Sequence, residues 1–238
     1  MSLYRDQGVV LRTIRLGEAD RIVTLATRDN GKVRAVAKGI RRTTSKFGGR
    51  LEPMSHVAVQ CWRGRELDIV TQAEVIDAFG RVRADLGRVG KAYTVLEVVD
   101  QLSQEGHVNV PLYDMVVGAL RVLEGGDSPL LVAAFVLKVL AAEGAAPELD
   151  VCVACGEDGE LVAFDPVEGG ALCRSCRRGR PLGPDSLALL RAILRGGLRA
   201  ALAEPASPVT DDVSALVTES IEAHLDRRLR SLHSAVVR

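Results

Sequence analysis

The first third of the chain alternates between apolar and polar residues in short runs. Five runs rich in Val, Ile and Thr, at residues 7–15, 21–29, 32–38, 55–62 and 67–77, predict β-strands. Asp29-Asn30-Gly31, between the second and third runs, is a strong turn sequence for a β-hairpin. Five strands in so short a segment favour a small barrel or sandwich. The glycine-rich stretch 37–54 predicts a loop between the third and fourth strands.

After Arg83 the apolar residues recur every three or four positions, as on one face of an amphipathic helix from Leu86 to Leu102. A second helix is predicted from Pro111 to Glu124. A third, with Ser128 as its N-cap and Pro129 as its first residue, is apolar almost all round, which indicates a central position in its domain. Helical spacing returns at 186–202 and 213–237, and Asp211 and Asp212 are interpreted as the N-cap of the last helix.

Composition narrows the class of protein. The chain has 238 residues, of which 47% are hydrophobic and 26% charged, and this favours a folded globular protein over a disordered one. The longest apolar run, 130–142, is shorter than the ~20 residues needed to span a bilayer. Arg5 and Asp6 stand where a signal peptide would need apolar residues. We therefore expect a cytoplasmic protein that has no membrane partner.

Charge is uneven along the chain although the net charge is zero. Residues 1–80 carry 14 basic and 9 acidic side chains, and residues 172–238 carry 11 and 7. The residues between these two segments are predominantly acidic. Any electrostatic partner is therefore expected at local basic regions rather than over the whole surface.

Four of the five cysteines form two CxxC pairs: Cys152 with Cys155, and Cys173 with Cys176. Two such pairs joined by a hairpin supply the four thiolates of a tetrahedral zinc site. Four protein ligands leave no open position, so the zinc is expected to be structural. A redox dithiol is the alternative reading. The fifth cysteine, Cys61, is interpreted as an ordinary buried or surface thiol.

Residues 32–50 contain no acidic side chain and seven basic ones: Lys32, Arg34, Lys38, Arg41, Arg42, Lys46 and Arg50. Such a cluster suits contact with a phosphodiester backbone, although a solvated loop has the same composition. Aromatic residues, on which single-strand binders stack bases, are sparse: only Phe47 lies in this segment, with Trp62 a strand away. Binding by backbone electrostatics is therefore expected. A second basic cluster, Arg174, Arg177, Arg178 and Arg180, is a possible secondary contact for DNA or a partner.

Enzyme motifs are missing from the sequence. It contains no GxGxxG, no GxxxxGK[ST] and no GxSxG, and the four histidines are scattered. The acidic residues of the middle segment have the scattered form of solvated helix faces rather than that of a divalent-metal nuclease. We therefore predict no catalytic residues.

Three segments carry a family resemblance. YRDQGVVLRT, GEADRIVTLATRDNGKVRAVAKGIRR and SKFGGRLEPMSHV closely resemble the N-terminal domain of the RecO family of bacterial recombination mediators. CVACG, Phe164, Gly169-Gly170 and CRSC resemble the zinc segment of that family, and HLDRRLRSLHSA resembles its C-terminal helix. The likeness covers essentially the whole chain. Some members of the family lack the four cysteines, so zinc does not define it.

The resemblance implies an α+β fold: an N-terminal five-stranded barrel of the oligonucleotide-binding (OB) type at 1–80, then a helical domain at 81–238 with an inserted four-cysteine zinc module at about 150–180. It implies a non-enzymatic protein that binds single- and double-stranded DNA and anneals complementary strands. The implied partners are RecR, single-stranded-DNA-binding protein and, indirectly, RecA. Lys38, Arg41, Arg42 and Arg50 match the basic positions of the family's AKG loop. The alternative function is an interaction scaffold without direct DNA contact.

Overall fold

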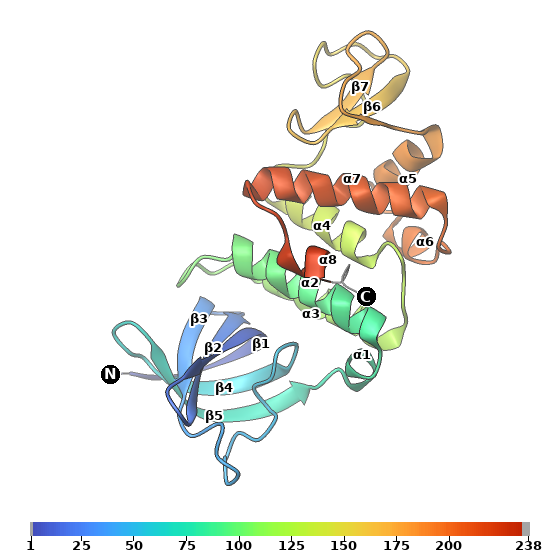
Figure 1. Cartoon of the computed structure of the whole chain (residues 1–238). Coiled ribbons are helices and arrows are strands. Elements are labelled where there is room, and N and C mark those ends of the chain that lie inside the picture. Colours follow the sequence, from blue (N-terminus) through green and yellow to red (C-terminus); the bar gives the residue numbers. More distant parts are fainter. Residues whose placement is uncertain (1, 235–238) are drawn as a thin grey trace. The chain divides into compact units, whose positions relative to one another are not determined.

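The computed structural model describes residues 2–234 and divides them into two compact units, 2–125 with 231–234, and 126–230 (Figure 1). Residues 2–125 of the first unit contain five strands and three helices: β1 (Leu3–Leu16), β2 (Asp20–Thr27), β3 (Gly31–Ala37), β4 (His56–Trp62), β5 (Asp68–Asp77), α1 (Gly80–Arg83), α2 (Leu86–Leu102) and α3 (Val110–Gly125). The second contains α4 (Leu131–Ala142), β6 (Leu161–Asp165), β7 (Gly170–Cys173), β8 (Arg180–Pro181), α5 (Pro184–Leu194), α6 (Leu198–Leu202) and α7 (Pro208–Leu225). A short helix, α8 (Arg230–Ser234), follows. The domain division predicted at residue 80 stays a prediction.

The five predicted strands are confirmed, and they close into a barrel in the order β1-β2-β3-β5-β4. All neighbouring strands are antiparallel except β3 and β5, which pair in parallel and close the barrel. Gly31 begins β3 with φ +68°, and a Cβ there would lie 2.1 Å from the carbonyl oxygen of His107. Glycine is therefore required where this hairpin meets the segment between α2 and α3.

The barrel core is formed by inward-facing residues of all five strands together with three residues of the β3–β4 loop. Its buried members are Val10, Val23, Leu25, Val33, Ala35, Ala37, Ile40, Phe47, Leu51, Val57, Val59, Cys61, Val70 and Ala73. Cys61 is thus a core residue. Because strand side chains alternate between faces, the intervening residues point outward.

An ion-pair network joins the barrel to α2 within the first unit. The carboxylate of Asp100 accepts from Arg12 Nε at 2.6 Å and lies 3.0 Å from Lys32 Nζ. Lys32 also donates to the carbonyl oxygens of Asp100 and Ser103. On α3, the hydroxyl of Tyr113 lies 2.8 Å from His56 Nε2 of β4. These contacts fix the helices against the barrel wall.

In the second unit, α4 is the central helix, as its all-round apolar sequence predicts, and it packs on α5, α6 and α7. It begins at Leu131 rather than at Pro129, because Ser128 accepts from the backbone N–H of Leu130 in a turn that precedes the helix. No helix within residues 2–234 is long and apolar enough to cross a membrane.

Three helix predictions need correction. The segment 186–202 is split into α5 and α6, with Gly196 at φ +106° between them. Asp211 and Asp212 are not the N-cap of α7: Ser207 is, in a capping box with Thr210, because Pro208 already occupies the first turn. The single helix predicted at 213–237 is also divided: α7 ends at Leu225, with Asp226 in the left-handed conformation, and α8 begins at Arg230. The part of the predicted helix at 235–237 lies outside the described residues.

Candidate metal centre and nucleic-acid interface

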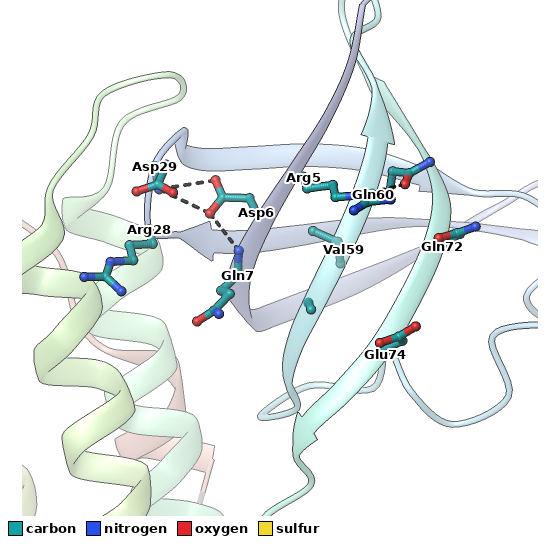
Figure 2. A pocket seen from close by; sticks show the side chains of 10 residues that line it. Arg5, Asp6, Gln7, Arg28, Asp29, Val59, Gln60, Gln72 and Glu74 are labelled. Carbon is teal, nitrogen blue, oxygen red and sulfur yellow. Dashed lines mark hydrogen bonds between the residues drawn. The ribbon is translucent and has the colours of Figure 1, made fainter.

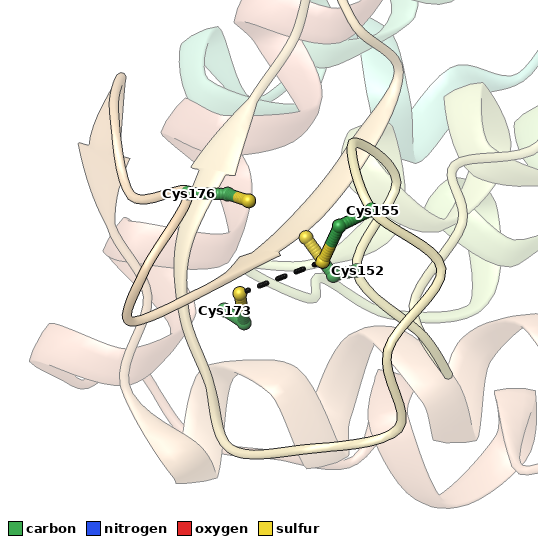
Figure 3. A group of neighbouring side chains, drawn as sticks. All are labelled: Cys152, Cys155, Cys173 and Cys176. Atoms are coloured by element: carbon green, nitrogen blue, oxygen red, sulfur yellow. Dashed lines mark hydrogen bonds between the residues drawn. The ribbon is translucent and has the colours of Figure 1, made fainter.

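The four cysteines of the two CxxC pairs come together at one end of the β6–β7 hairpin (Figure 3). Their sulfur atoms all lie within 4.8 Å of one another, and none is in a disulfide. The Sγ atoms of Cys155 and Cys173 are 3.8 Å apart. A tetrahedron with metal–sulfur bonds of ~2.3 Å has sulfur–sulfur edges of ~3.8 Å. The cluster therefore fits a four-thiolate metal ion, and soft tetrahedral ligands of this kind fit zinc.

Local backbone geometry brings the two pairs together. After the first pair, Gly156 takes φ +75° and its N–H donates to the carbonyl oxygen of Cys152. β6 and β7 then place Cys173 opposite Leu161 and carry the second pair back toward the first. The sequence Cys-Val-Ala-Cys-Gly thus folds as a tight turn that directs both sulfurs inward.

Hydrogen bonds shift the pKa values of the thiols in the cluster. Backbone N–H groups, that of Cys173 foremost, lower the pKa of Cys152 to about 6. Hydrogen bonds with the neighbouring sulfurs of Cys155 and Cys173 raise the pKa of Cys176 to about 12. Four thiolates at this separation repel one another unless a cation lies among them, so metal binding and deprotonation are coupled.

The glycine-rich segment between β3 and β4 is a loop, and it is attached to the barrel through its apolar residues. Ile40, Phe47 and Leu51 are buried in the barrel core, and Phe47 is only 1% exposed. Phe47 is therefore unable to stack on a nucleic-acid base. The basic residues between these three apolar residues point outward and are exposed.

The predicted DNA-contacting residues fall into two groups, five in this loop and two on β3. Lys38, Arg41, Arg42, Lys46 and Arg50 are exposed, and within the described residues none forms an ion pair with a carboxylate. Three of them donate to backbone carbonyls: Arg41 to Glu18 at 2.8 Å, Lys46 to Thr71 at 2.8 Å, and Arg50 to Lys46. These bonds hold the side chains in place and leave their charges uncompensated.

Lys32 and Arg34, on β3, have different surroundings. The Lys32 side chain is 14% exposed and is engaged by Asp100. Arg34 pairs with Glu105 at 3.3 Å. Their assignment to DNA contact stays a prediction, and the five loop residues form the better-exposed part of the predicted set.

The second basic cluster is largely neutralised. Arg174 pairs with Glu160, and Arg178 pairs with Asp165 and Glu168. Arg180 contacts two carboxylates of α7, those of Asp212 and Glu219. Arg177 is exposed and forms no ion pair among the contacts of the described residues. The cluster thus fastens the cysteine module to its own acidic residues and to α7.

Sequence reasoning missed two exposed arginines, Arg63 and Arg65, in the turn between β4 and β5. The guanidinium of Arg63 lies 4.9 Å from the ring centre of Tyr4 and donates to Asn30 Oδ1. Both arginines line a pocket of about 310 Å3 that Arg34 also lines. The sequence feature that indicates them is the presence of two arginines in the turn between the fourth and fifth predicted strands.

A larger pocket, of about 600 Å3, lies on the outer face of β1, β4 and β5 (Figure 2). Its lining is mixed in charge: Arg5 donates to Gln60, and Asp6 accepts from the backbone N–H groups of Gln7 and Asp29. Glu74 and Gln72 complete the β5 side. Two arginines and three carboxylates line this pocket, so its charges are mixed and give it no cationic character.

Two family models match the chain. Residues 1–79 match the model described as Recombination protein O N terminal. Residues 83–233 match the model described as Recombination protein O C terminal. Residues 80–82 separate the two matches, shortly after the barrel ends at Asp77, and together the matches cover nearly all of the sequence.

Proposed function

Because the chain belongs to the RecO family and so has a role in DNA repair and recombination, we propose that it is a non-enzymatic mediator that binds single- and double-stranded DNA. It anneals complementary single strands. With a RecR partner, it promotes loading of RecA onto DNA coated by single-stranded-DNA-binding protein. It acts in the cytoplasm, at the nucleoid, where reduced cysteines persist.

The observation that carries the DNA-binding part of this proposal is the set of five exposed, carboxylate-free cations at Lys38, Arg41, Arg42, Lys46 and Arg50. Each phosphate that such a side chain neutralises releases condensed counterions. Cations that contact the phosphate backbone do not read the edges of the bases, so binding has little sequence preference.

Annealing follows from the same electrostatics. Two single strands repel because each carries one negative charge per nucleotide, and a cationic surface that binds both lowers that repulsion. The protein supplies no bond-making step, in keeping with a sequence that lacks nucleophile and metal-hydrolase motifs.

The cysteine cluster holds structural zinc in this proposal, with Cys152, Cys155, Cys173 and Cys176 as its four ligands. A closed four-thiolate site offers no position for substrate. The ion instead cross-links the two turns that carry the CxxC pairs, beside buried apolar residues of β6 and β7 such as Phe164 and Leu172.

The decisive measurement is fluorescence anisotropy of a labelled oligonucleotide titrated with protein across a salt series. We expect tight binding that weakens linearly in log salt, at similar strength for unrelated sequences. Absence of binding at low salt contradicts direct DNA contact and favours the interaction scaffold.

The finer parts of the proposal have separate tests. Mixing with purified RecR, followed by size-exclusion chromatography, tests the partnership. Renaturation of complementary strands coated by single-stranded-DNA-binding protein tests annealing, and RecA filament formation on the coated strand tests loading. Incubation of labelled DNA with Mg²⁺ tests for cleavage, and we expect the DNA to remain intact.

A further inference from the structure

Two threonines occupy the middle of the exposed part of the β3–β4 loop. Thr43 and Thr44 lie between Ile40 and Phe47, whose side chains are 7% and 1% exposed and hold the loop to the barrel core. Between these two buried residues every side chain is exposed except that of Ser45, which is half-buried. The intervening segment therefore lies on the surface with both of its ends fixed.

The two threonines are the central residues of a β-turn. The backbone N–H of Ser45 donates to the carbonyl oxygen of Arg42 at 3.0 Å, which is the hydrogen bond that closes such a turn around the two residues between them. The central residues of a turn project away from the chain that it reverses. Thr43 and Thr44 are thus presented to solvent by a backbone of defined shape.

The three hydroxyl groups of this segment have different surroundings. Ser45 Oγ accepts from the backbone N–H of Phe47 at 3.2 Å and so takes part in the turn that buries the phenylalanine. The hydroxyls of Thr43 and Thr44 form no hydrogen bond with any residue that the structure describes. A reagent or an enzyme therefore reaches the two threonine hydroxyls without breaking a contact of the fold, whereas the serine hydroxyl has a structural partner.

Cations lie on both sides of the two threonines. Arg41 and Arg42 precede them directly, and Lys46 follows. Arg41 donates to the carbonyl oxygen of Glu18, and Lys46 to that of Thr71, so both charges are held in place. Arg42 has no carboxylate partner in the described part of the chain. A negative group added at the turn therefore has cations beside it and displaces no existing ion pair.

We propose that Thr43 and Thr44 are phosphorylation sites for a serine/threonine protein kinase that selects basic residues before its target, and that the added phosphate weakens DNA binding by this loop. Such kinases recognise arginine by complementary charge, and Arg41 and Arg42 supply that pattern. The inference rests on the proposed DNA-binding function and deepens it by naming how the same loop is regulated.

The modification is a phosphoryl transfer from ATP. The threonine Oγ forms a bond to the γ-phosphorus, the bond from that phosphorus to the oxygen bridging it to the β-phosphorus breaks, and ADP leaves with the electron pair. The hydroxyl proton passes to the catalytic aspartate of the kinase. The new phosphate carries a charge of about −1.5 to −2 at neutral pH.

The added charge acts directly on the exposed cations of the loop. A phosphate beside an arginine forms charge-assisted hydrogen bonds with its guanidinium, so Arg42 becomes engaged within the protein. Each cation paired in this way is no longer available to a DNA phosphate, and the affinity of such a surface depends on how many phosphates it neutralises. Phosphothreonine also repels the DNA backbone. Both effects weaken binding to single strands and to duplexes.

The first measurement maps the modification. The full-length protein is isolated from its own cells before and after DNA damage, and a second sample is incubated with Mg²⁺-ATP and a kinase that selects basic residues. Mass spectrometry of both is expected to find phosphate on Thr43 or Thr44 and none on Ser45. Thr43→Val combined with Thr44→Val keeps the shape of both side chains and removes both hydroxyls, so this variant should lose the phosphate.

The second measurement isolates the effect of charge. Thr43→Asp combined with Thr44→Asp adds two negative charges, and its matched control is Thr43→Asn combined with Thr44→Asn, which has nearly the same size and no charge. By anisotropy at low salt, we expect the aspartate variant to bind DNA about tenfold more weakly than the asparagine variant, with a log–log salt slope lower by about 0.7–1.4. Protein phosphorylated by the kinase should show a loss at least as large.

Three results would overturn the inference while leaving DNA binding intact. The first is absence of phosphate from both threonines in the cellular protein under both conditions. The second is failure of the kinase to modify either threonine, and the third is equal DNA affinity of the aspartate and asparagine variants. If the unmodified protein does not bind DNA at all, the proposed function fails, whereas the phosphate map still decides whether the two threonines are modified.

Discussion

Two regions of the molecule are rich in arginine and lysine, yet their charges have different surroundings. The first basic region, residues 32–50, presents five exposed cations at 38–50 with no carboxylate partner among the described residues. In the second basic region, residues 174–180, three of four arginines are paired with carboxylates. Two basic segments that both lack acidic residues therefore give an open cationic surface in one region and an internally balanced one in the other.

The difference teaches that the position of acidic residues decides what a basic cluster does. The loop between β3 and β4 contains no acid before Glu52. The cysteine module, in contrast, carries Asp165 and Glu168 close to Arg178. Exposed ion pairs of this kind contribute little to stability, but they cancel the field that a polyanion would otherwise encounter.

The largest effect is expected from loss of the metal site in the cysteine module, which carries the second basic region. We expect Cys173→Ser to lose the metal and to unfold the residues around β6 and β7, because structural zinc supplies on the order of 10 kcal/mol to such modules. Metal analysis and hydrogen exchange measure both effects, with Ser175→Ala as the matched control in the same turn. If the second region does not contact DNA, affinity stays within about twofold; normal metal content in the variant contradicts the four-cysteine site.

Reversing charge in each region compares them directly. We expect Arg41→Glu with Arg42→Glu to weaken single-strand binding roughly ten- to hundredfold and to reduce the log–log salt slope by about 1.4, since each contact contributes about 0.7. Arg174→Glu with Arg177→Glu changes net charge equally and should have less than about a twofold effect. Anisotropy measures both variants. Equal losses would show that the two regions are equivalent.

A variant at Lys32 tests whether this buried, paired residue differs in role from the exposed cations of the same basic region. Lys32→Met removes the donor to two carbonyl oxygens and one partner of Asp100, so we expect the free energy of unfolding to fall by about 1–3 kcal/mol. DNA affinity should remain near that of the wild type. Chemical denaturation and anisotropy separate the two effects. A large loss of affinity with unchanged stability would place Lys32 among the DNA contacts.

The smallest effect is expected at Arg180, which links β8 to α7. Arg180→Ala removes ion pairs with Asp212 and Glu219 that are partly exposed, and so should cost about 0.2–1 kcal/mol. Thermal unfolding measures this change. A loss of DNA affinity in this variant would show that the paired arginine still contacts a phosphate.

The elements of the fold with a local signal could be predicted from the sequence. The five strands follow from their alternating runs, and the cysteine cluster follows from the spacing of the two CxxC pairs. The cap of α7 was misassigned to Asp211 and Asp212, because the competing Ser207–Thr210 capping box lies only a few residues earlier.

The partners of charged and apolar side chains could not be predicted, because they depend on contacts between residues distant in sequence. Nothing near Lys32 indicates that Asp100 will approach it. The parallel pairing of β3 with β5 likewise aligns Val36 with Ile69, and β4 then aligns Trp62 with them. Trp62 of β4 is thereby aligned, through Ile69 of β5, with Val36 of β3.

The burial of Ile40, Phe47 and Leu51 has a consequence for the cost of association. A free loop loses conformational entropy when it settles on a ligand, and that loss subtracts from affinity. Here folding of the barrel has already restricted the loop, since its three apolar side chains are fixed in the core. In the proposed DNA binding, the cations between these side chains are therefore partly preorganised, and electrostatic attraction would be opposed mainly by the ordering of the nucleic acid.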